Sequence, residues 1–168
     1  MIIEYPNKTQ YFEGIHGEYD DFSVFLAGTI DDGQSANWQR ELINKIYSGL
    51  PDSVIVFNPR RDNWNKNANV DTLREQINWE QEHLLNSSII VMVLLDDSKS
   101  PVSLMELGEF CDSQKIVVFC TENFYRFENV KDLCERFEIP LFETNDINEI
   151  ADKVVEIIKF NQFESLSD

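Results

Sequence analysis

Positive charge is scarce in this sequence. Its 168 residues include 14 Lys and Arg against 31 Asp and Glu, which gives a formal net charge of −17. Binding to nucleic acid polymers and to anionic membrane surfaces depends on Lys and Arg side chains that replace counterions. We therefore expect neither a nucleic acid polymer nor a membrane surface as a partner.

Long apolar segments and clustered cysteines are also missing. The longest uninterrupted apolar run, Ile89 to Leu95, is far shorter than the roughly 20 residues that a membrane-spanning helix needs. The N-terminus lacks the basic and then apolar pattern of a signal peptide, so we expect a soluble, cytoplasmic protein. The three cysteines, Cys111, Cys120 and Cys134, form no CxxC or Cys/His cluster, which argues for reduced thiols and against a metal site.

The sequence nevertheless has enough apolar residues for a core, since 42% of them are hydrophobic. From Phe22 onward, short apolar runs alternate with helical patterns. Strands are expected at Phe22–Ala27, Val54–Asn58, Ser88–Leu95, Lys115–Cys120 and Pro140–Glu143, and helices near Ser35–Ser48, Asp71–Asn86, Ser103–Asp112, Val130–Phe137 and Ile147–Phe160. Nearly continuous apolar strands are covered on both faces, so the pattern predicts a doubly wound α/β fold with a parallel sheet.

We expect one domain over residues 1–168, with the α/β core at 22–160. The N-terminal extension, residues 1–21, does not follow the alternation. It is expected either as a short hairpin, Ile2–Tyr5 with Gln10–Phe12, or as a loosely attached arm.

In such a sheet, ligands bind beyond the carboxyl ends of the strands, where the strand order reverses. Four polar or aromatic loops follow the expected strands: Gly28–Ser35, Asn58–Asn69, Asp96–Ser103 and Thr121–Asn129. None matches a P-loop or GxGxxG, so the common triphosphate and dinucleotide fingerprints are missing.

Glu80 is a candidate site residue because of its place on a helix. On a helical wheel, Leu73, Ile77, Glu80 and Leu84 fall on one narrow stripe, which puts the carboxylate among inward-facing apolar residues. A buried carboxylate needs partners, and carboxylates in clefts cluster at functional sites. The alternative is a charge at the end of the stripe that reaches solvent or binds backbone groups.

Glu106 is a candidate because it follows the expected third strand closely. The wheel assigns the buried face to Leu104, Leu107, Gly108 and Cys111 and turns Glu106 away from it. We expect Glu106 in the first helical turn with Ser103 as N-cap, where the helix dipole favours an ionised carboxylate. Attack on a sugar anomeric carbon requires such a carboxylate. The alternative is a capping box of Ser103 and Glu106 that only stabilises the helix.

Arg60 and Arg61 stand out in so acidic a chain. They follow Pro59 in a strand-end loop, where they would bind a ligand phosphate or carboxylate, or else pair with acidic side chains. The three tryptophans, Trp38, Trp64 and Trp79, would stack on a base or belong to the core.

Five segments together resemble the nucleoside 2-deoxyribosyltransferase-like family over about Phe22 to Phe137. They read FLAGTI, NPRRDNW, QINWEQEHL, SPVSLMELGEF and KIVVFCTENFYRFENVKDLCERF. The resemblance implies a flavodoxin-like five-stranded parallel sheet and an enzyme that cleaves the N-glycosidic bond of deoxynucleosides or deoxynucleotides. It also implies a covalent glycosyl-glutamate intermediate whose sugar passes to another base or to water, with no cofactor.

The resemblance assigns roles to particular residues. Glu106 of MELGE matches the nucleophile, and Glu80 of NWE matches an acidic residue that protonates the leaving base or positions the sugar. Asp97 is a further candidate for relaying the proton. The transferases carry an aspartate shortly before the nucleophile, where this chain reads DDSKSPVS. The residues expected to bind substrate are Gly28, Thr29, Asn58, Arg60, Arg61, Trp64 and Ser103.

Two other functions stay open at this point. One is a sensor that binds a nucleotide-like ligand without turnover, and the other is a glycohydrolase of NAD-type dinucleotides. We also expect a homo-oligomer in which a neighbour completes the pocket, with Phe124 and Tyr125 as exposed aromatic residues for that contact.

Overall fold

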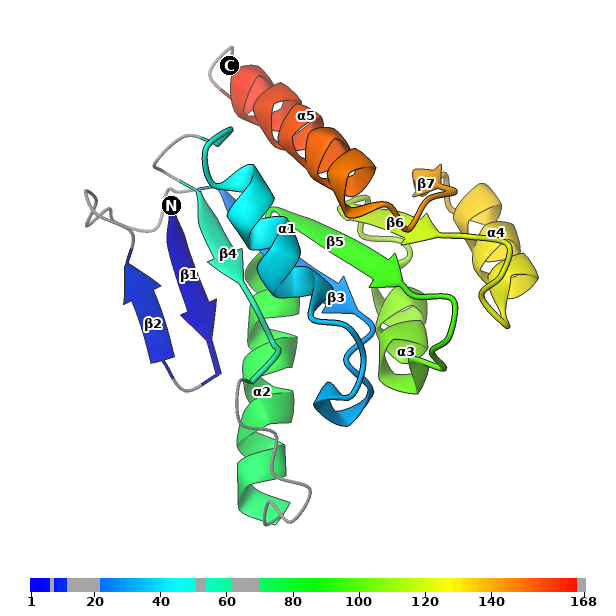
Figure 1. Cartoon of the computed structure of the whole chain (residues 1–168), viewed down its shortest axis with the longest axis horizontal. Coiled ribbons are helices and arrows are strands. Elements are labelled where there is room, and N and C mark those ends of the chain that lie inside the picture. The colour runs from blue at the N-terminus through cyan, green and yellow to red at the C-terminus, as the bar shows by residue number, and fades with distance from the viewer. Residues whose placement is uncertain (7, 12–21, 51–53, 62–69, 166–168) are drawn as a thin grey trace.

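The computed structural model describes residues 1–6, 8–11, 22–50, 54–61 and 70–165 (Figure 1). These ranges contain one sheet, five α-helices and the short 3-10 helix η1 (Asp31–Gly33). The strands are β1 (Ile2–Tyr5), β2 (Lys8–Tyr11), β3 (Ser23–Gly28), β4 (Ile55–Phe57), β5 (Ile89–Leu94), β6 (Ile116–Cys120) and β7 (Leu141–Phe142). The helices are α1 (Trp38–Ile46), α2 (Val70–Asn86), α3 (Pro101–Phe110), α4 (Phe127–Arg136) and α5 (Ile147–Ser165).

The strand order is β2-β1-β4-β3-β5-β6-β7. The last five strands in this order are the five expected ones, and numbered among themselves they run 2-1-3-4-5, the flavodoxin-like order. The predicted doubly wound parallel sheet is therefore confirmed. The N-terminal hairpin forms as well, and β1 adds to the sheet by pairing in parallel with β4, with Ile3 opposite Val56. The hairpin thus forms one edge of the sheet and is not a loose arm.

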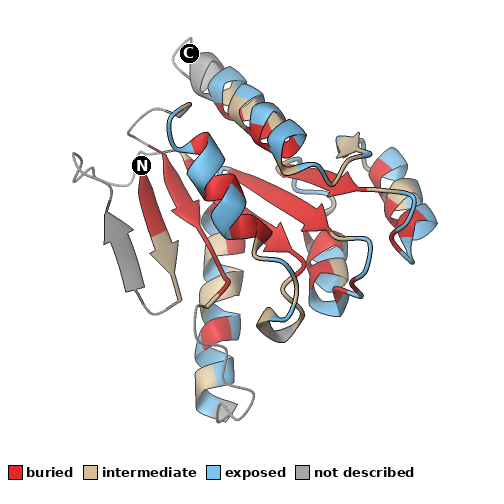
Figure 2. Ribbon diagram, in the orientation of Figure 1, coloured by how far each residue is buried: buried red, intermediate tan, exposed pale blue. Residues whose placement is uncertain are grey.

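Helices cover both faces of the sheet (Figure 1). Helices α1 and α5 pack on one face, and α2, α3 and α4 pack on the other. Successive side chains of a strand point to opposite faces, so Val24 and Leu26 join the first layer while Phe25 and Ala27 join the second. All residues of β3 and β5 are buried, as Figure 2 shows in red. This burial explains why these strands read as uninterrupted apolar runs.

Helix α3 differs from the expectation in start and orientation. It begins at Pro101, and its N-cap is Ser100 with a φ of 43°, so Ser103 lies inside the first turn and no capping box with Glu106 exists. Proline suits this first position because its missing N–H would have no intrahelical partner. The buried residues of the helix are Ser103, Glu106, Leu107 and Phe110, so the expectation that Glu106 points away from the buried face is wrong.

The aromatic residues are mostly core. Trp38 is buried in the core layer on the α1 and α5 face of the sheet, and its Nε1 donates a hydrogen bond to the Thr29 carbonyl at 2.8 Å. Phe124 is buried too, which contradicts the expectation of an exposed residue, whereas Tyr125 is half exposed. Phe124 packs with the α3 and α4 side chains behind the sheet.

None of the helices in the described ranges combines the length and apolar character that crossing a bilayer requires.

Candidate active site

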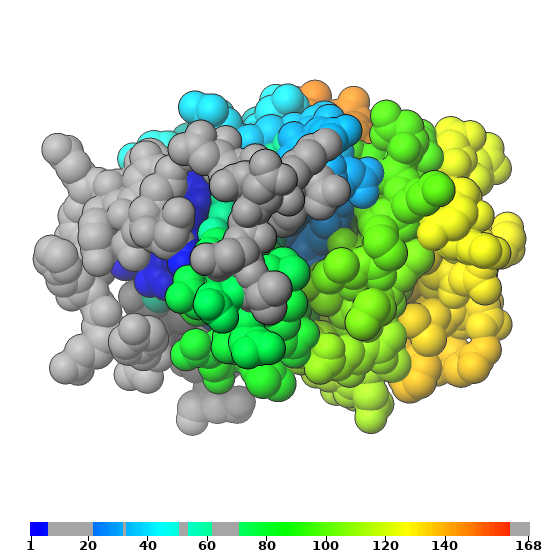
Figure 3. All heavy atoms as spheres, turned by 90° about the horizontal axis from the view of Figure 1, so that it is seen from below, coloured from blue at the N-terminus to red at the C-terminus, as the bar shows by residue number. Residues whose placement is uncertain are grey.

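A cavity of about 450 Å³ opens at the carboxyl ends of β3 and β5. The chain leaves β3 for α1 on one face of the sheet and leaves β5 for α3 on the other, which makes this the point of strand-order reversal. In Figure 3 a hollow with blue atoms at its base lies between α2 in green and α3 in yellow-green. The described residues that line the cavity are Phe25, Ala27, Gly28, Ile30, Asp31, Pro59, Leu73, Gln76, Ile77, Glu80, Ser100, Pro101, Val102, Ser103 and Glu106.

Helix α2 forms one wall through residues spaced three and four apart. Leu73, Gln76, Ile77 and Glu80 all line the cavity, because this spacing places side chains on one helical face. Leu73 and Ile77 are 51% and 47% exposed, whereas Leu84, nearer the C-terminal end of the same stripe, is completely buried. The predicted stripe therefore exists, but its N-terminal part faces an open cavity and only its C-terminal end enters the core.

Glu80 has a defined set of partners on this wall. The Gln76 side chain donates a hydrogen bond from Nε2 to Glu80 Oε1 at 2.7 Å. Burial raises the pKa of Glu80, while the Gln76 hydrogen bond and the positive charge of Arg61 act in the opposite direction. These two partners stabilise the ionised form of Glu80.

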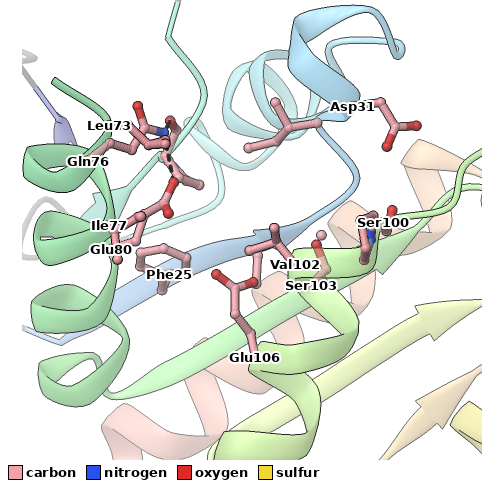
Figure 4. A pocket seen from close by; sticks show the side chains of 15 residues that line it. Phe25, Asp31, Leu73, Gln76, Ile77, Glu80, Ser100, Val102, Ser103 and Glu106 are labelled. Atoms are coloured by element: carbon pink, nitrogen blue, oxygen red, sulfur yellow. Dashed lines mark hydrogen bonds between the residues drawn. The ribbon is translucent and has the colours of Figure 1, made fainter. Parts of the chain in front are cut away.

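Glu106 lies on the facing wall, on α3 (Figure 4). It is 8% exposed, and its carboxyl group has no hydrogen-bond partner among the described residues. Burial raises the pKa of Glu106 to about 8, and the negative charges of Glu80 and Glu109 contribute to the rise. A pKa of about 8 favours the protonated form of Glu106 at neutral pH. The sequence led us to expect a hydrogen-bonded Glu80 with a raised pKa and an ionised Glu106. The direction for Glu80 agrees with this expectation, whereas the raised pKa of Glu106 contradicts it.

The comparisons with known proteins concern the family and the fold of the chain. The family described as "Nucleoside 2-deoxyribosyltransferase like" matches residues 21–124, which is more than half of the chain and includes both glutamates. The chain belongs to this family. Membership in the nucleoside 2-deoxyribosyltransferase-like family supports a nucleoside-related function.

Eight solved chains match the structure of this family member. One is the crystal structure of a conserved protein from Enterococcus faecalis V583, with a TM-score of 0.60 and 13% sequence identity over 84% of this chain and 99% of that one. At this identity, the likeness concerns the fold. No curated protein matches the sequence.

The loop after β3 carries the first two residues that the family resemblance pointed to. Gly28 lines the cavity with a φ of 128°, and a Cβ atom there would lie 2.1 Å from the Val93 carbonyl oxygen. Only glycine fits, because two strand ends meet there. Thr29 is completely buried and is not among the described lining residues; its hydroxyl is hydrogen bonded to Ser98 and Ser100 at 2.8 and 2.7 Å. Thr29 thus supports the turn that places Ser100 at the cavity.

The arginines of the NPRR loop have different environments. Arg60 is buried, and its guanidinium donates hydrogen bonds to the carbonyl oxygens of Gly33, Ser35 and Ala36 and to the Ser35 hydroxyl, at 2.7–3.2 Å. It ties the β3–α1 loop to the end of β4 and is not among the described residues that line the cavity. We expected Arg60 to bind either a ligand phosphate or carboxylate or an acidic side chain, but its partners are backbone carbonyl groups and a serine hydroxyl. Arg61 acts on the cavity through its charge beside Glu80.

The other expected site residues are only partly brought together. Ser103 is buried and lines the cavity one turn before Glu106. Asn58 is buried and accepts a hydrogen bond from the Arg60 backbone N–H at 3.0 Å, which shapes the loop. Asp97 is exposed and is absent from the described cavity lining, and Trp64 lies outside the described residues.

Three polar residues of the cavity were missed by sequence reasoning, namely Gln76, Asp31 and Ser100. Gln76 shares the α2 stripe with Glu80 at a spacing of four, so the wheel could have revealed it. Asp31, at the end of the cavity nearer Ser100 in Figure 4, has a φ of 45° and gave no such signal. Within the described part of the chain, no group of three or more His, Cys, Asp or Glu side chains is arranged to hold a metal ion.

Proposed function

We propose that this protein cleaves the N-glycosidic bond of a nucleoside or nucleotide through a covalent glycosyl-glutamate intermediate on Glu106. The observation that carries the proposal is the pair of carboxyl groups, Glu80 and Glu106, on facing walls of one cavity at the strand-order reversal. Apolar side chains between them, such as Phe25 and Ile77, suit the faces of a base and a sugar ring.

The protonation of the pair suits the first chemical step. Two close carboxyl groups titrate as a unit, and the raised pKa of Glu106 leaves the pair with one proton at neutral pH. A Glu106 oxygen forms a bond to C1′ while the C1′–N bond breaks and its electron pair goes to the base nitrogen. The proton of the pair passes to the base, with Glu80 as the relay on the wall opposite Glu106. The products are a neutral base and a glycosyl ester, so charge and atoms balance.

The second step releases the sugar. Water or the N–H of another base attacks C1′ from the face that the first base left, and its proton returns to the carboxyl pair. Two displacements at one carbon give net retention of configuration. Attack by water makes the protein a hydrolase, and attack by a base makes it a transferase.

The test is a product assay with a matched pair of variants. The protein is incubated with deoxynucleosides, their 5′-monophosphates and NAD, with and without a free acceptor base, and the products are separated by chromatography. We expect base release or base exchange with wild type, at least about 1,000-fold less with Glu106→Gln, and near-wild-type rates with Glu109→Gln. Glu109 is the exposed glutamate one turn further along the same helix. Full activity of Glu106→Gln would refute the assignment, and ligand binding without any product would favour a sensor.

A further inference from the structure

Gln76 is a buried polar side chain in the cavity that the proposed chemistry leaves without a task of its own. It is 5% exposed and lines the cavity one turn before Glu80. Its Nε2 donates two hydrogen bonds, to the Pro59 carbonyl oxygen at 3.2 Å and to Glu80 Oε1 at 2.7 Å. Figure 4 shows the second of these bonds on the α2 wall.

These two bonds fix the orientation of the Gln76 amide. A glutamine side chain has two N–H donors and one carbonyl acceptor, and its ends can exchange places to suit a ligand. The Pro59 carbonyl can only accept a hydrogen bond, so the nitrogen must face it, and the other N–H is taken by Glu80. No donor among the described residues reaches Gln76 Oε1. Towards a ligand, Gln76 is therefore an acceptor only.

An acceptor-only group discriminates between bases with an exocyclic amino group and bases with an oxo group, which also carry a hydrogen on the adjacent ring nitrogen. Adenine and cytosine carry an exocyclic amino group, a donor, where hypoxanthine and uracil carry an oxo oxygen, an acceptor. An amino group would donate to Gln76 Oε1, and the ring nitrogen beside it would take the proton relayed by Glu80. An oxo group would set two acceptor oxygens against each other. The apolar neighbours on the wall, Leu73 and Ile77, have no donor that could satisfy the mismatched oxygen atoms.

We propose that Gln76 is a specificity-determining residue that selects nucleosides with an exocyclic amino group on the base over their oxo counterparts. The proposal rests on the proposed function, because it places the departing base between Glu106 and the α2 wall. The specificity concerns the exocyclic group of the base and is the same whether the sugar passes to water or to another base.

The experiment compares substrates that differ in this substituent and in the hydrogen on the adjacent ring nitrogen. Values of kcat/KM are measured for 2′-deoxyadenosine against 2′-deoxyinosine and for 2′-deoxycytidine against 2′-deoxyuridine. With wild type, we expect the amino member to be preferred about tenfold or more in at least one pair. With Gln76→Met, which keeps the length of the side chain and removes the acceptor, the ratio falls towards one. Gln81→Met is the matched control on the same helix, since Gln81 contacts Glu109 and is outside the described cavity lining.

Two results would overturn the proposal. One is equal or faster turnover of the oxo members by wild type, which needs no variant, and the other is an unchanged ratio in folded Gln76→Met. If wild type releases no base from any nucleoside, the proposed function fails. The same pairs are then compared by calorimetric binding to Glu106→Gln with and without Gln76→Met. Tighter binding of the amino members that depends on Gln76 supports the specificity, and equal binding or no measurable binding rejects it.

Discussion

Replacing Glu106 with glutamine should stabilise the fold in alkaline solution. The carboxyl group of Glu106 has a pKa of about 8 in the folded protein, against 4.5 for the unperturbed group. Between these two values, the folded state binds one proton more than the unfolded state does. Unfolding free energy therefore falls as pH rises, by roughly 1.4 kcal/mol for each pH unit from this group alone. Glutamine has no proton to lose and removes this dependence.

The expected difference follows from the two pKa values. At pH 5, neutral carboxyl and carboxamide groups are similar in size and polarity, so wild type and Glu106→Gln should be about equally stable. Above pH 8 the variant should be more stable by up to (8 − 4.5) × 1.4, or about 5 kcal/mol. For a chain of 168 residues, that difference corresponds to a higher Tm by the order of 10 °C.

Urea unfolding of both proteins at unit intervals from pH 5 to pH 9 measures this difference. Other titrating groups contribute almost equally to both proteins and cancel when the two curves are subtracted. Glu109→Gln serves as the control: its carboxylate is exposed, and its charge is the smallest of the three causes that raise the Glu106 pKa, so its stability difference should change much less with pH than that of Glu106→Gln. A stability difference between wild type and Glu106→Gln that does not grow with pH would refute the reasoning. The predicted result would mean that the fold gives up stability to keep a carboxyl group in its cavity.

Two more predictions concern the pH profile and the floor of the cavity. Since the proposed step uses the proton of the carboxyl pair, kcat/KM should fall as pH rises through about 8. In Glu80→Gln this fall in kcat/KM should occur at lower pH, because the variant lacks a negative charge that raises the pKa of Glu106. If the fall occurs at the same pH in the variant and in wild type, the charge of Glu80 does not act on the pKa of Glu106. Gly28→Ala should destabilise the fold by about 3 kcal/mol or more, as measured by urea unfolding, because its Cβ would lie 2.1 Å from the Val93 carbonyl oxygen. A loss below 1 kcal/mol would show that the two strand ends can separate at little cost.

Periodicity was enough to predict the five core strands, the helices and the α2 wall. It failed on α3, where Ser103 and Glu106 occupy the buried face. A wheel assigns burial by hydrophobicity, and the buried face of α3 turns polar where it meets a cavity. The pairing of β1 with β4 could not be predicted either, because a short strand joins whichever edge the finished sheet offers.

The role of Arg60 shows a second limit of sequence reasoning. Its acceptors are mostly backbone carbonyls of residues 33–36, about 25 positions earlier in the chain. Backbone carbonyls are present at every residue, so no sequence pattern marks those that a guanidinium will find. The scarcity of arginine identified Arg60 as important, and only the tertiary structure distinguishes a structural tie from a ligand contact.

The two glutamates belong to helices and not to the loops around them. Helices α2 and α3 rest on the same face of the sheet, and between them Phe25 and Ala27 of β3 form the floor of the cavity. The spacing of the two carboxyl groups thus depends on how far apart the sheet holds these two helices, while the loops after β3 and β4 add contacts around the cavity. A change in these loops can therefore alter the contacts to a ligand without moving the two carboxyl groups.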